Sequence, residues 1–241
     1  MGILPAATVG LDAAGLPPHL FPFGIADDVA APVTLADCLA SLPAVTQRQC
    51  SRNETVFLDG DPVDCVMAVA HGAVRHCRYA PDGRRHISDF SFAGDVIGLL
   101  ECPDQPAAAE AVTDVTLLSW PRAAFDRLAA RDMEVRQRML CHLTAAHLDA
   151  QRHLFVLGCL SAKERVAAFL LRLADRLGVA PGRRIAIPMC RQDIADHLGL
   201  TVETVCRAIT HLRNLGAVCV PGPRHLILTD MPKLRALAIE S

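Results

Sequence analysis

The fold is decided by residues 191–207, which read RQDIADHLGLTVETVCR. A small residue, Ala195, is followed four residues later by Gly199, the spacing expected where one helix crosses the next and the chain turns tightly between them. Apolar residues that would hold the two helices at a steep angle recur through the stretch and just beyond it, at Ile194, Leu198, Leu200, Val205 and Ala208. The stretch therefore predicts a helix-turn-helix.

The second helix of this unit is expected to run from about Val202 to residue 214, before Gly216. Its N-terminal turns, the part of such a helix that enters the major groove, present Val202, Glu203, Cys206 and Arg207. Arg207 can donate a bidentate pair to guanine, and Glu203 can accept from cytosine N4. Because they are four residues apart, the two side chains can also orient one another. These four residues are predicted to read bases.

The neighbouring sequence supplies the rest of a DNA-binding domain. Two β-prone stretches, 218–220 and 226–228, flank Pro221-Gly222-Pro223-Arg224 and predict a hairpin wing. Upstream, Ser161 and Glu164 form a capping box that starts a helix ending at Gly178. Residues 160–241 carry 12 Lys or Arg against 7 Asp or Glu, whereas residues 1–159 carry 12 against 19. The basic residues 160–241 are expected to contact the phosphates of the DNA backbone. The residues expected to do so are Arg183, Arg184, Arg191, Thr201 and Thr204.

Residues 52–120 have a different pattern. Glycines at positions 60, 72, 83 and 94 separate short β-prone stretches, at 55–58, 65–70, 73–79, 86–92 and 115–120. Turn residues at this spacing predict an antiparallel β-roll. Residues 1–30, rich in Gly, Pro and Ala, are expected to form a loose arm. The predicted domains are this arm, a roll over 31–133, a long helix over 134–158 and the DNA-binding domain over 159–241.

The long helix, Glu134 to about Leu157, would measure roughly 36 Å, which is longer than a small roll needs for cover. Its apolar residues recur at three- and four-residue steps, at Met139, Leu143, Ala146, Ala150, Leu154 and Leu157. A narrow apolar stripe on such a helix suits pairing with a second copy of the chain. The expected fold class is therefore α+β, with a roll, a dimerisation helix and a C-terminal winged helix-turn-helix.

This order of elements resembles the cyclic-AMP receptor protein and fumarate–nitrate reductase regulator superfamily over about residues 35–230. Its most specific part is Val202-Glu203-Thr204-Val205-Cys206-Arg207, which is similar to the recognition helix of the anaerobic branch, with Cys206 in place of the usual serine. The resemblance implies a homodimeric bacterial regulator that binds double-stranded DNA and works with RNA polymerase. It implies half-sites close to TTGA, with Glu203 and Arg207 on the central G·C pair.

The sequence does not support the ligands known in that superfamily. Where a cyclic nucleotide would need a carboxylate for the ribose and an arginine for the phosphate, the chain has Leu99 and no arginine between Arg85 and Arg122. An iron–sulfur cluster needs four thiolates, and the N-terminal side offers only Cys38 and Cys50. No cofactor and no metal are expected. Haem remains the alternative, for a regulator that senses nitric oxide or carbon monoxide, with candidate ligands at His71, His76, Cys77, His86 and Cys102.

With neither a cyclic-nucleotide site nor the cysteines for an iron–sulfur cluster, the chain looks most like the FixK-type regulators. That resemblance implies an activator of genes for low-oxygen respiration that acts without a bound ligand and is limited by its own supply. A thiol switch is a further expectation. Cys190 precedes the first helix of the helix-turn-helix, where a helix N-terminus and Arg191 favour a thiolate. Its oxidation would place negative charge beside DNA phosphates.

Composition excludes several other classes of protein. Apolar residues make up 51% and charged residues 21% of 241, which is globular composition with no uninterrupted apolar run long enough to span a membrane. The first basic residue is Arg48, so no signal peptide is expected, and the ten cysteines contain no CxxC pair. No nucleophile–base pair, phosphate loop or HExxH motif indicates an enzyme. The chain is therefore expected to be cytoplasmic, reduced and not catalytic.

Overall fold

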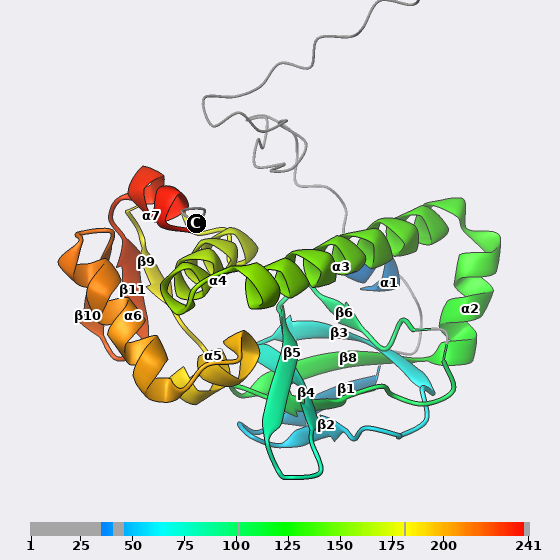
Figure 1. Ribbon diagram of the computed structural model, residues 1–241. Helices are drawn as coiled ribbons and strands as arrows, with labels where there is room; N and C mark the ends of the chain where they lie inside the picture. The colour runs from blue at the N-terminus through cyan, green and yellow to red at the C-terminus, as the bar shows by residue number, and fades with distance from the viewer. Residues whose placement is uncertain (1–34, 41–45, 101, 181, 239–241) are drawn as a thin grey trace, which may run out of the picture. The chain divides into compact units, whose positions relative to one another are not determined.

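The computed structural model describes residues 35–40, 46–100, 102–180 and 182–238. All of them lie in one unit, Thr34–Ser241. The expected α+β class, with a β-roll followed by helices and a C-terminal winged helix-turn-helix, is confirmed (Figure 1). The expected arm at residues 1–30 lies outside the described residues. No described helix is both long and apolar enough to cross a membrane.

The roll, residues 46–121, consists of two four-stranded antiparallel sheets. The first has the order β1-β8-β3-β6, formed by Thr46–Cys50, Val115–Pro121, Cys65–His71 and Val96–Ile97. The second has the order β2-β7-β4-β5, formed by Thr55–Phe57, Ala108–Ala111, Ala73–Tyr79 and Arg85–Phe92. The longest pairing, β4 with β5, continues to a turn at Pro81-Asp82-Gly83, which contains one of the glycines expected between strands.

Alternating side chains build the core of the roll. Val74, Ala109, Ala111, Val115 and Leu117 are each at most 2% exposed and pack together with other residues of both sheets. Between β3 and β4 the chain turns at Gly72, whose φ is +90°. A Cβ at this position would lie 2.3 Å from the carbonyl oxygen of Asp114, so only glycine fits. The glycine spacing that predicted the roll therefore marks real turns.

Three helices lie against the roll: α1 (Leu35–Ala40), α2 (Arg122–Arg131) and α3 (Met133–Cys159). Asp132 caps α3 by accepting from the backbone amides of Glu134 and Val135. Trp120, Phe125 and Val135 are at most 3% exposed and join α1, α2, α3 and the first sheet in one apolar cluster. The N-terminal half of α3 is thus fixed to its own roll.

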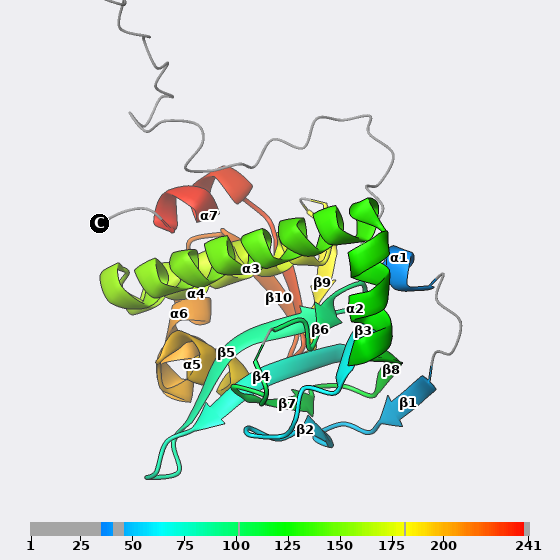
Figure 2. The same cartoon turned by 90° about the vertical axis from the view of Figure 1, so that its right-hand side faces the viewer.

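The C-terminal part, which we call the reading unit, comprises residues 162–237. Its elements are α4 (Ala162–Arg176), β9 (Arg184–Ala186), α5 (Arg191–Leu198), α6 (Val202–Asn214), β10 (Val218–Gly222), β11 (His225–Leu228) and α7 (Met231–Leu237). The three strands form a sheet in the order β10-β11-β9, which contains the predicted wing. Figures 1 and 2 show α5 beside the β4–β5 hairpin, and α5 contacts β5.

Several elements were not predicted from the sequence. Strands β1, β6 and β7 and helix α7 have no counterpart among the expected elements. The long helix begins one residue earlier and ends two residues later than expected. Helix α6 has the expected bounds.

Candidate nucleic-acid interface

The turn between α5 and α6 has the geometry that the sequence predicts. Gly199 ends α5 in the left-handed conformation, with φ 63° and ψ 38°, and its amide donates to the carbonyl oxygen of Ala195. Leu200 N also donates to this oxygen, over 2.9 Å. Ala195 is fully buried, which leaves room for the second helix to cross the first. The helix-turn-helix is therefore present at residues 191–214.

The two helices pack through the apolar residues expected to join them. Ile194, Leu198, Val205 and Ala208 are at most 2% exposed, and all belong to the largest apolar cluster of the described residues. Arg165 on α4 donates to the carbonyl oxygen of Leu198 over 3.1 Å and so satisfies one of the carbonyls left free at the end of α5. The unit is packed on one side and leaves α6 free on the other.

The exposed face of α6 contains the predicted base-reading residues. Glu203, Cys206 and Arg207 are exposed and Val202 is half-buried, while the opposite face is buried. Thr210, one turn beyond Cys206, is also exposed on this helix. Sequence reasoning missed Thr210, although its spacing of seven residues from Glu203 places both on the same face of a helix. The exposed face thus offers one acceptor, one guanidinium, one thiol and one hydroxyl.

Glu203 is held as an anion. Its pKa is lowered by hydrogen bonding to its own backbone amide and by the Thr201 hydroxyl, and to a lesser extent by the charge of Arg207. The described helices carry side-chain ion pairs at Arg122–Asp126, Glu134–Arg138 and Asp149–Arg152, but Glu203 and Arg207 form no such pair. Both charged groups therefore remain available to a base pair.

The two threonines expected at the phosphates serve the helix as well. Thr201 is the N-cap of α6, and its Oγ1 accepts from the amide of Thr204 over 3.3 Å. The two hydroxyls lie 3.0 Å apart. Because the first turn of a helix carries free amides and a positive dipole, this end of α6 is suited to a phosphate.

The expected phosphate-binding arginines lie at different depths. Arg183 and Arg184 are exposed at the start of β9, whereas Arg191 is half-buried at the start of α5. Burial lowers the pKa of Arg191, and the neighbouring Cys206 opposes this effect. Arg224, in the turn of the wing, is exposed and was not singled out from the sequence. The wing sequence Pro221-Gly222-Pro223-Arg224 already indicated its position.

Cys190 is half-buried and is the N-cap of α5, as the sequence predicts. Its environment has one feature that the sequence argument did not include. The backbone amide of Cys190 and its thiol both donate to Oδ2 of Asp193, each over 3.2 Å. The Asp193 carboxylate therefore holds both the amide and the thiol of Cys190 at the start of α5.

The apolar stripe expected at the dimer interface is divided in the structure. Met139 and Leu143 are half-buried and pack against the cluster that fixes α3 to the roll. Ala146 and Ala150 are exposed, Leu154 is 69% exposed and Leu157 is half-buried. Further along the helix surface lie three large apolar side chains that were not predicted there, namely Leu140 at 51%, Leu148 at 44% and Phe155 at 59% exposed. We call Leu140, Leu148, Leu154 and Phe155 the exposed stripe.

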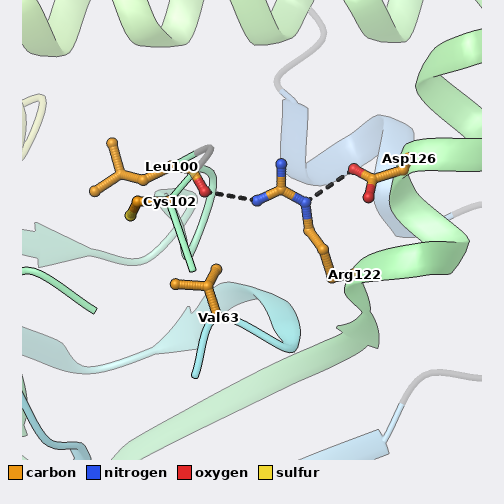
Figure 3. A pocket seen from close by; sticks show the side chains of 5 residues that line it. All are labelled: Val63, Leu100, Cys102, Arg122 and Asp126. Carbon is orange, nitrogen blue, oxygen red and sulfur yellow. Dashed lines mark hydrogen bonds and ion pairs between the residues drawn. The ribbon is translucent and has the colours of Figure 1, made fainter. Parts of the chain in front are cut away.

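The region expected to lack a cyclic-nucleotide cradle contains an arginine that comes from elsewhere in the sequence. Arg122, at the start of α2, lines a pocket of about 330 Å³ with Val63, Leu100, Cys102 and Asp126 (Figure 3). Its guanidinium donates to Asp126 and to the carbonyl oxygen of Leu100, each over 2.8 Å. Leu99, where a ribose would need a carboxylate, is 4% exposed. The residues present therefore do not fit a cyclic nucleotide.

The haem candidates are dispersed. His76 on β4 shares a hydrogen bond of 2.9 Å with Ser91, and burial lowers its pKa. Cys77 is fully buried, and burial raises the pKa of its thiol to about 11. His71 and His86 are exposed, and Cys102 is half-buried. Among the described residues no group of three or more His, Cys, Asp or Glu side chains is arranged to hold a metal ion.

Comparisons with known proteins agree with this geometry. The model of the Crp-like helix-turn-helix domain matches residues 164–237, and that of the cyclic nucleotide-binding domain matches residues 47–132. The two matches coincide with the reading unit and with the roll and α2.

Similar proteins span about three quarters or more of the chain. The nitrogen fixation regulation protein FixK of Azorhizobium caulinodans is 37% identical over 215 residues, which are 88% of this chain and 85% of the relative. FixK of Rhizobium meliloti is 39% identical over 76% of this chain and 82% of its own. Among solved structures, FixK2 from Bradyrhizobium japonicum is 34% identical with a TM-score of 0.78, over 83% of this chain and all of that one.

Proposed function

Since the chain belongs to the FixK branch of the CRP/FNR superfamily of transcription regulators, we propose that it activates genes of low-oxygen or anaerobic respiration by binding a TTGA-N6-TCAA palindrome as a homodimer. It is a regulator with a DNA-binding helix-turn-helix and not an enzyme. It works in the cytoplasm, where the bacterial chromosome lies, with DNA, a second copy of itself and RNA polymerase as partners.

The exposed face of α6 is the observation that carries this proposal. Glu203 and Arg207 project from a helix whose opposite face is buried in the helix-turn-helix, and neither is tied up by the other. A glutamate that accepts from cytosine N4 and an arginine that donates to guanine O6 and N7 together read one G·C pair. Val202, Cys206 and Thr210 flank this pair of residues on the same helix.

The direction and purpose of regulation are supported by the names of relatives. Those with 34% and 30% identity are the transcriptional activatory protein AadR of Rhodopseudomonas palustris and the transcriptional activator protein FnrL of Cereibacter sphaeroides. A relative with 27% identity is the anaerobic regulatory protein of Haemophilus influenzae. Activation of transcription, under anaerobic conditions, is the role that these names support for this chain.

The proposed dimer interface is the exposed stripe of α3. An isolated, solvated stripe of four large apolar side chains on one long helix is unusual for a monomer. Two antiparallel or parallel copies of α3 bury such a stripe by the packing seen in coiled coils. Of the apolar residues expected at the interface from the sequence, Met139 and Leu143 pack against the cluster that fixes α3 to the roll. Ala146, Ala150 and Leu154 remain available to the partner.

We further propose that the regulator needs no small ligand and that Cys190 is its oxidation-sensitive thiol. The poor fit of the roll to a cyclic nucleotide supports the first part. For the second, oxidation of the Sγ atom removes the hydrogen bond to Asp193 and adds negative charge beside a carboxylate at the start of α5. The effect on DNA binding then comes from disturbance of α5 as well as from repulsion of phosphates.

A gel-shift titration tests the proposed function. Metal-free, reduced protein should bind a duplex with TTGA-N6-TCAA and discriminate by about 1000-fold or more against a scrambled duplex of the same composition. Equal binding to both duplexes would refute the proposed target sequence. Repeating the titration with cyclic AMP should change nothing.

A further inference from the structure

A cluster of buried charges joins the roll to the reading unit. Asp193 on α5 is 1% exposed, which is rare for a carboxylate unless it is paired. Its Oδ1 accepts from two guanidinium groups of the β4–β5 hairpin: from Arg85 Nη2 over 2.7 Å and from Arg75 Nη1 over 3.3 Å. One turn further along α5, Asp196 Oδ2 accepts from Arg85 Nε over 2.8 Å. Arg85 therefore spans two acidic residues of the same helix.

The arginines are held in place from the roll side. Arg75 is 7% exposed and makes two hydrogen bonds to Oε2 of Glu110 on β7, over 2.9 and 2.7 Å. Burial alone would raise the pKa of Glu110, but hydrogen bonds from Arg75 and Tyr79 outweigh it and lower the pKa. For Arg85, Asp196 and Asp193 similarly outweigh burial and raise the pKa. The five charges form a satisfied network, which we call the clamp: Arg75, Arg85, Glu110, Asp193 and Asp196.

A second set of contacts fixes the same helix. His197 on α5, 3% exposed, shares a hydrogen bond of 2.9 Å with the carbonyl oxygen of Ile87 on β5. Its ring stacks on that of His153 from α3 at a centroid distance of 4.1 Å. Phe90 of β5 meets the His197 ring edge-on at 5.3 Å. Helix α5 is therefore held by both the roll and the dimerisation helix.

The covalent connection between α3 and the reading unit is short and extended. Helix α3 ends at Cys159, Leu160 follows with φ −93° and ψ 145°, and α4 begins at Ala162. Two extended residues allow rotation about single bonds and do not by themselves set an angle between helices. The orientation of the reading unit is therefore set by non-covalent contacts. They include the clamp, the contacts of His197, and the ion pairs that Arg172 and Arg176 of α4 make with Asp89, Asp95 and Asp149. Asp193 of the clamp is 1% exposed.

We propose that the clamp positions the helix-turn-helix for simultaneous binding of two half-sites, and that Arg85 and Asp193 are its principal positioning residues. This inference rests on the proposed dimeric DNA binding. Two recognition helices fit one face of the duplex only at a fixed separation of about 34–36 Å, so each must be held at a fixed angle to the dimerisation helix.

The clamp makes a specific demand on operator spacing. If the clamp fixes the separation of the recognition helices, weakening the clamp should reduce the preference in affinity for TTGA-N6-TCAA over duplexes with N5, N7 or N8 spacers. Binding to a single TTGA half-site needs only one reading unit, so it stays unchanged. Substitution of a residue that merely stabilises the fold would weaken all of these complexes alike.

Arg85→Gln is the test variant, because Arg85 is at the rim of the clamp and its loss leaves Arg75 beside Asp193. Its preference for the N6 spacer should fall by about tenfold or more, with half-site binding within about twofold of wild type. The double variant Arg85→Gln/Asp196→Asn should be no worse than Arg85→Gln, because both changes remove the same contact. The matched control is Arg84→Gln, an exposed neighbour paired only with Asp82 on its own hairpin, which should behave as wild type.

Hydrogen exchange without DNA tests the clamp independently of the operator. In Arg85→Gln the backbone amides of α5 and β5 should exchange faster than in wild type, and in Arg84→Gln they should not. Unchanged exchange in Arg85→Gln, an unchanged N6 preference, or an equal loss on the half-site would each overturn the inference. Failure of the wild type to distinguish TTGA-N6-TCAA from a scrambled duplex would instead refute the proposed target, and the exchange experiment would still decide on the clamp.

Discussion

Leu154→Ala should dissociate the dimer while leaving each protomer folded. Leu154 is 69% exposed, and full burial of a leucine side chain contributes about 1.5–3 kcal/mol. Covering roughly two thirds of it would contribute about 1–2 kcal/mol, and twofold symmetry doubles this to about 2–4 kcal/mol. The dimer Kd should therefore rise roughly 30- to 700-fold. Sedimentation equilibrium over a range of protein concentrations measures it.

Two matched leucines serve as controls. Leu58→Ala removes a 56% exposed leucine from the roll and should leave the dimer Kd unchanged. Leu143→Ala removes a half-buried leucine that packs on the cluster of α1, α2 and the first sheet, so it should lower the free energy of unfolding by about 1–3 kcal/mol with a smaller effect on dimerisation. A tight dimer in Leu154→Ala, or a monomer in Leu58→Ala, would refute the assignment of the interface to the exposed stripe.

Three further predictions concern the reading unit. Cys190→Ser should bind the palindrome like the reduced wild type and keep this affinity after peroxide, because serine preserves the cap of α5 but is not oxidised. Equal inactivation of both proteins by peroxide in a gel shift would exclude Cys190 as the switch. Burial, reinforced by His153, lowers the pKa of His197 to about 3. Between about pH 6.5 and pH 3 the unfolded chain therefore binds a proton that the buried ring excludes. The free energy of unfolding should be maximal above about pH 6.5 and fall towards pH 3 by up to about 1.4 kcal/mol per pH unit. Urea unfolding should show this slope, and His197→Phe should flatten it; an unchanged slope would contradict the assignment. Arg183→Gln/Arg184→Gln should weaken binding to specific and scrambled duplexes alike and, with two arginines lost from each of two protomers, reduce the slope of log K against log salt by about 4. A loss confined to the palindrome would instead mean that these arginines read bases.

The sequence predicted the parts of the fold whose signals are local. The turn at Gly199, the capping box at Ser161 and Glu164 and the glycines of the roll each depend on a few adjacent residues, and each is present. Helix α6 combines a cap, an apolar face and a stop signal, so even its bounds were correct. The candidate base-reading residues followed from those bounds, because helical spacing fixes which side chains share a face.

The missed elements lack such local signals. Four of the five residues of strand β1, Thr46–Cys50, are exposed and polar, and the strand forms because β8 offers a free edge. Strand β7, Ala108–Ala111, is composed of residues that favour helices, and pairing with β2 and β4 overrides that preference. These strands depend on partners distant in the sequence, which periodicity does not reveal.

The same limit applies to the sites. The periodicity of α3 identified an apolar stripe but not which part of it the roll covers, so Leu143 was grouped with Leu154. The hydrogen bond between Cys190 and Asp193 is a contact three residues apart that the capping-box pattern does anticipate. The ion pairs of Asp193, however, are made with Arg75 and Arg85, more than 100 positions earlier in the chain. Only the folded structure brings these arginines to α5.

The most direct test of the account is the reading of the central G·C pair by Arg207. When this pair is changed to A·T in both half-sites of TTGA-N6-TCAA, the wild type should lose about 1–3 kcal/mol per half-site, which is about 30- to 25,000-fold in affinity at one fixed salt concentration. Arg207→Ala should bind the unchanged palindrome more weakly, by about 1–3 kcal/mol per half-site, and should no longer distinguish the two duplexes. Full discrimination by Arg207→Ala would contradict the assignment of α6 as the recognition helix.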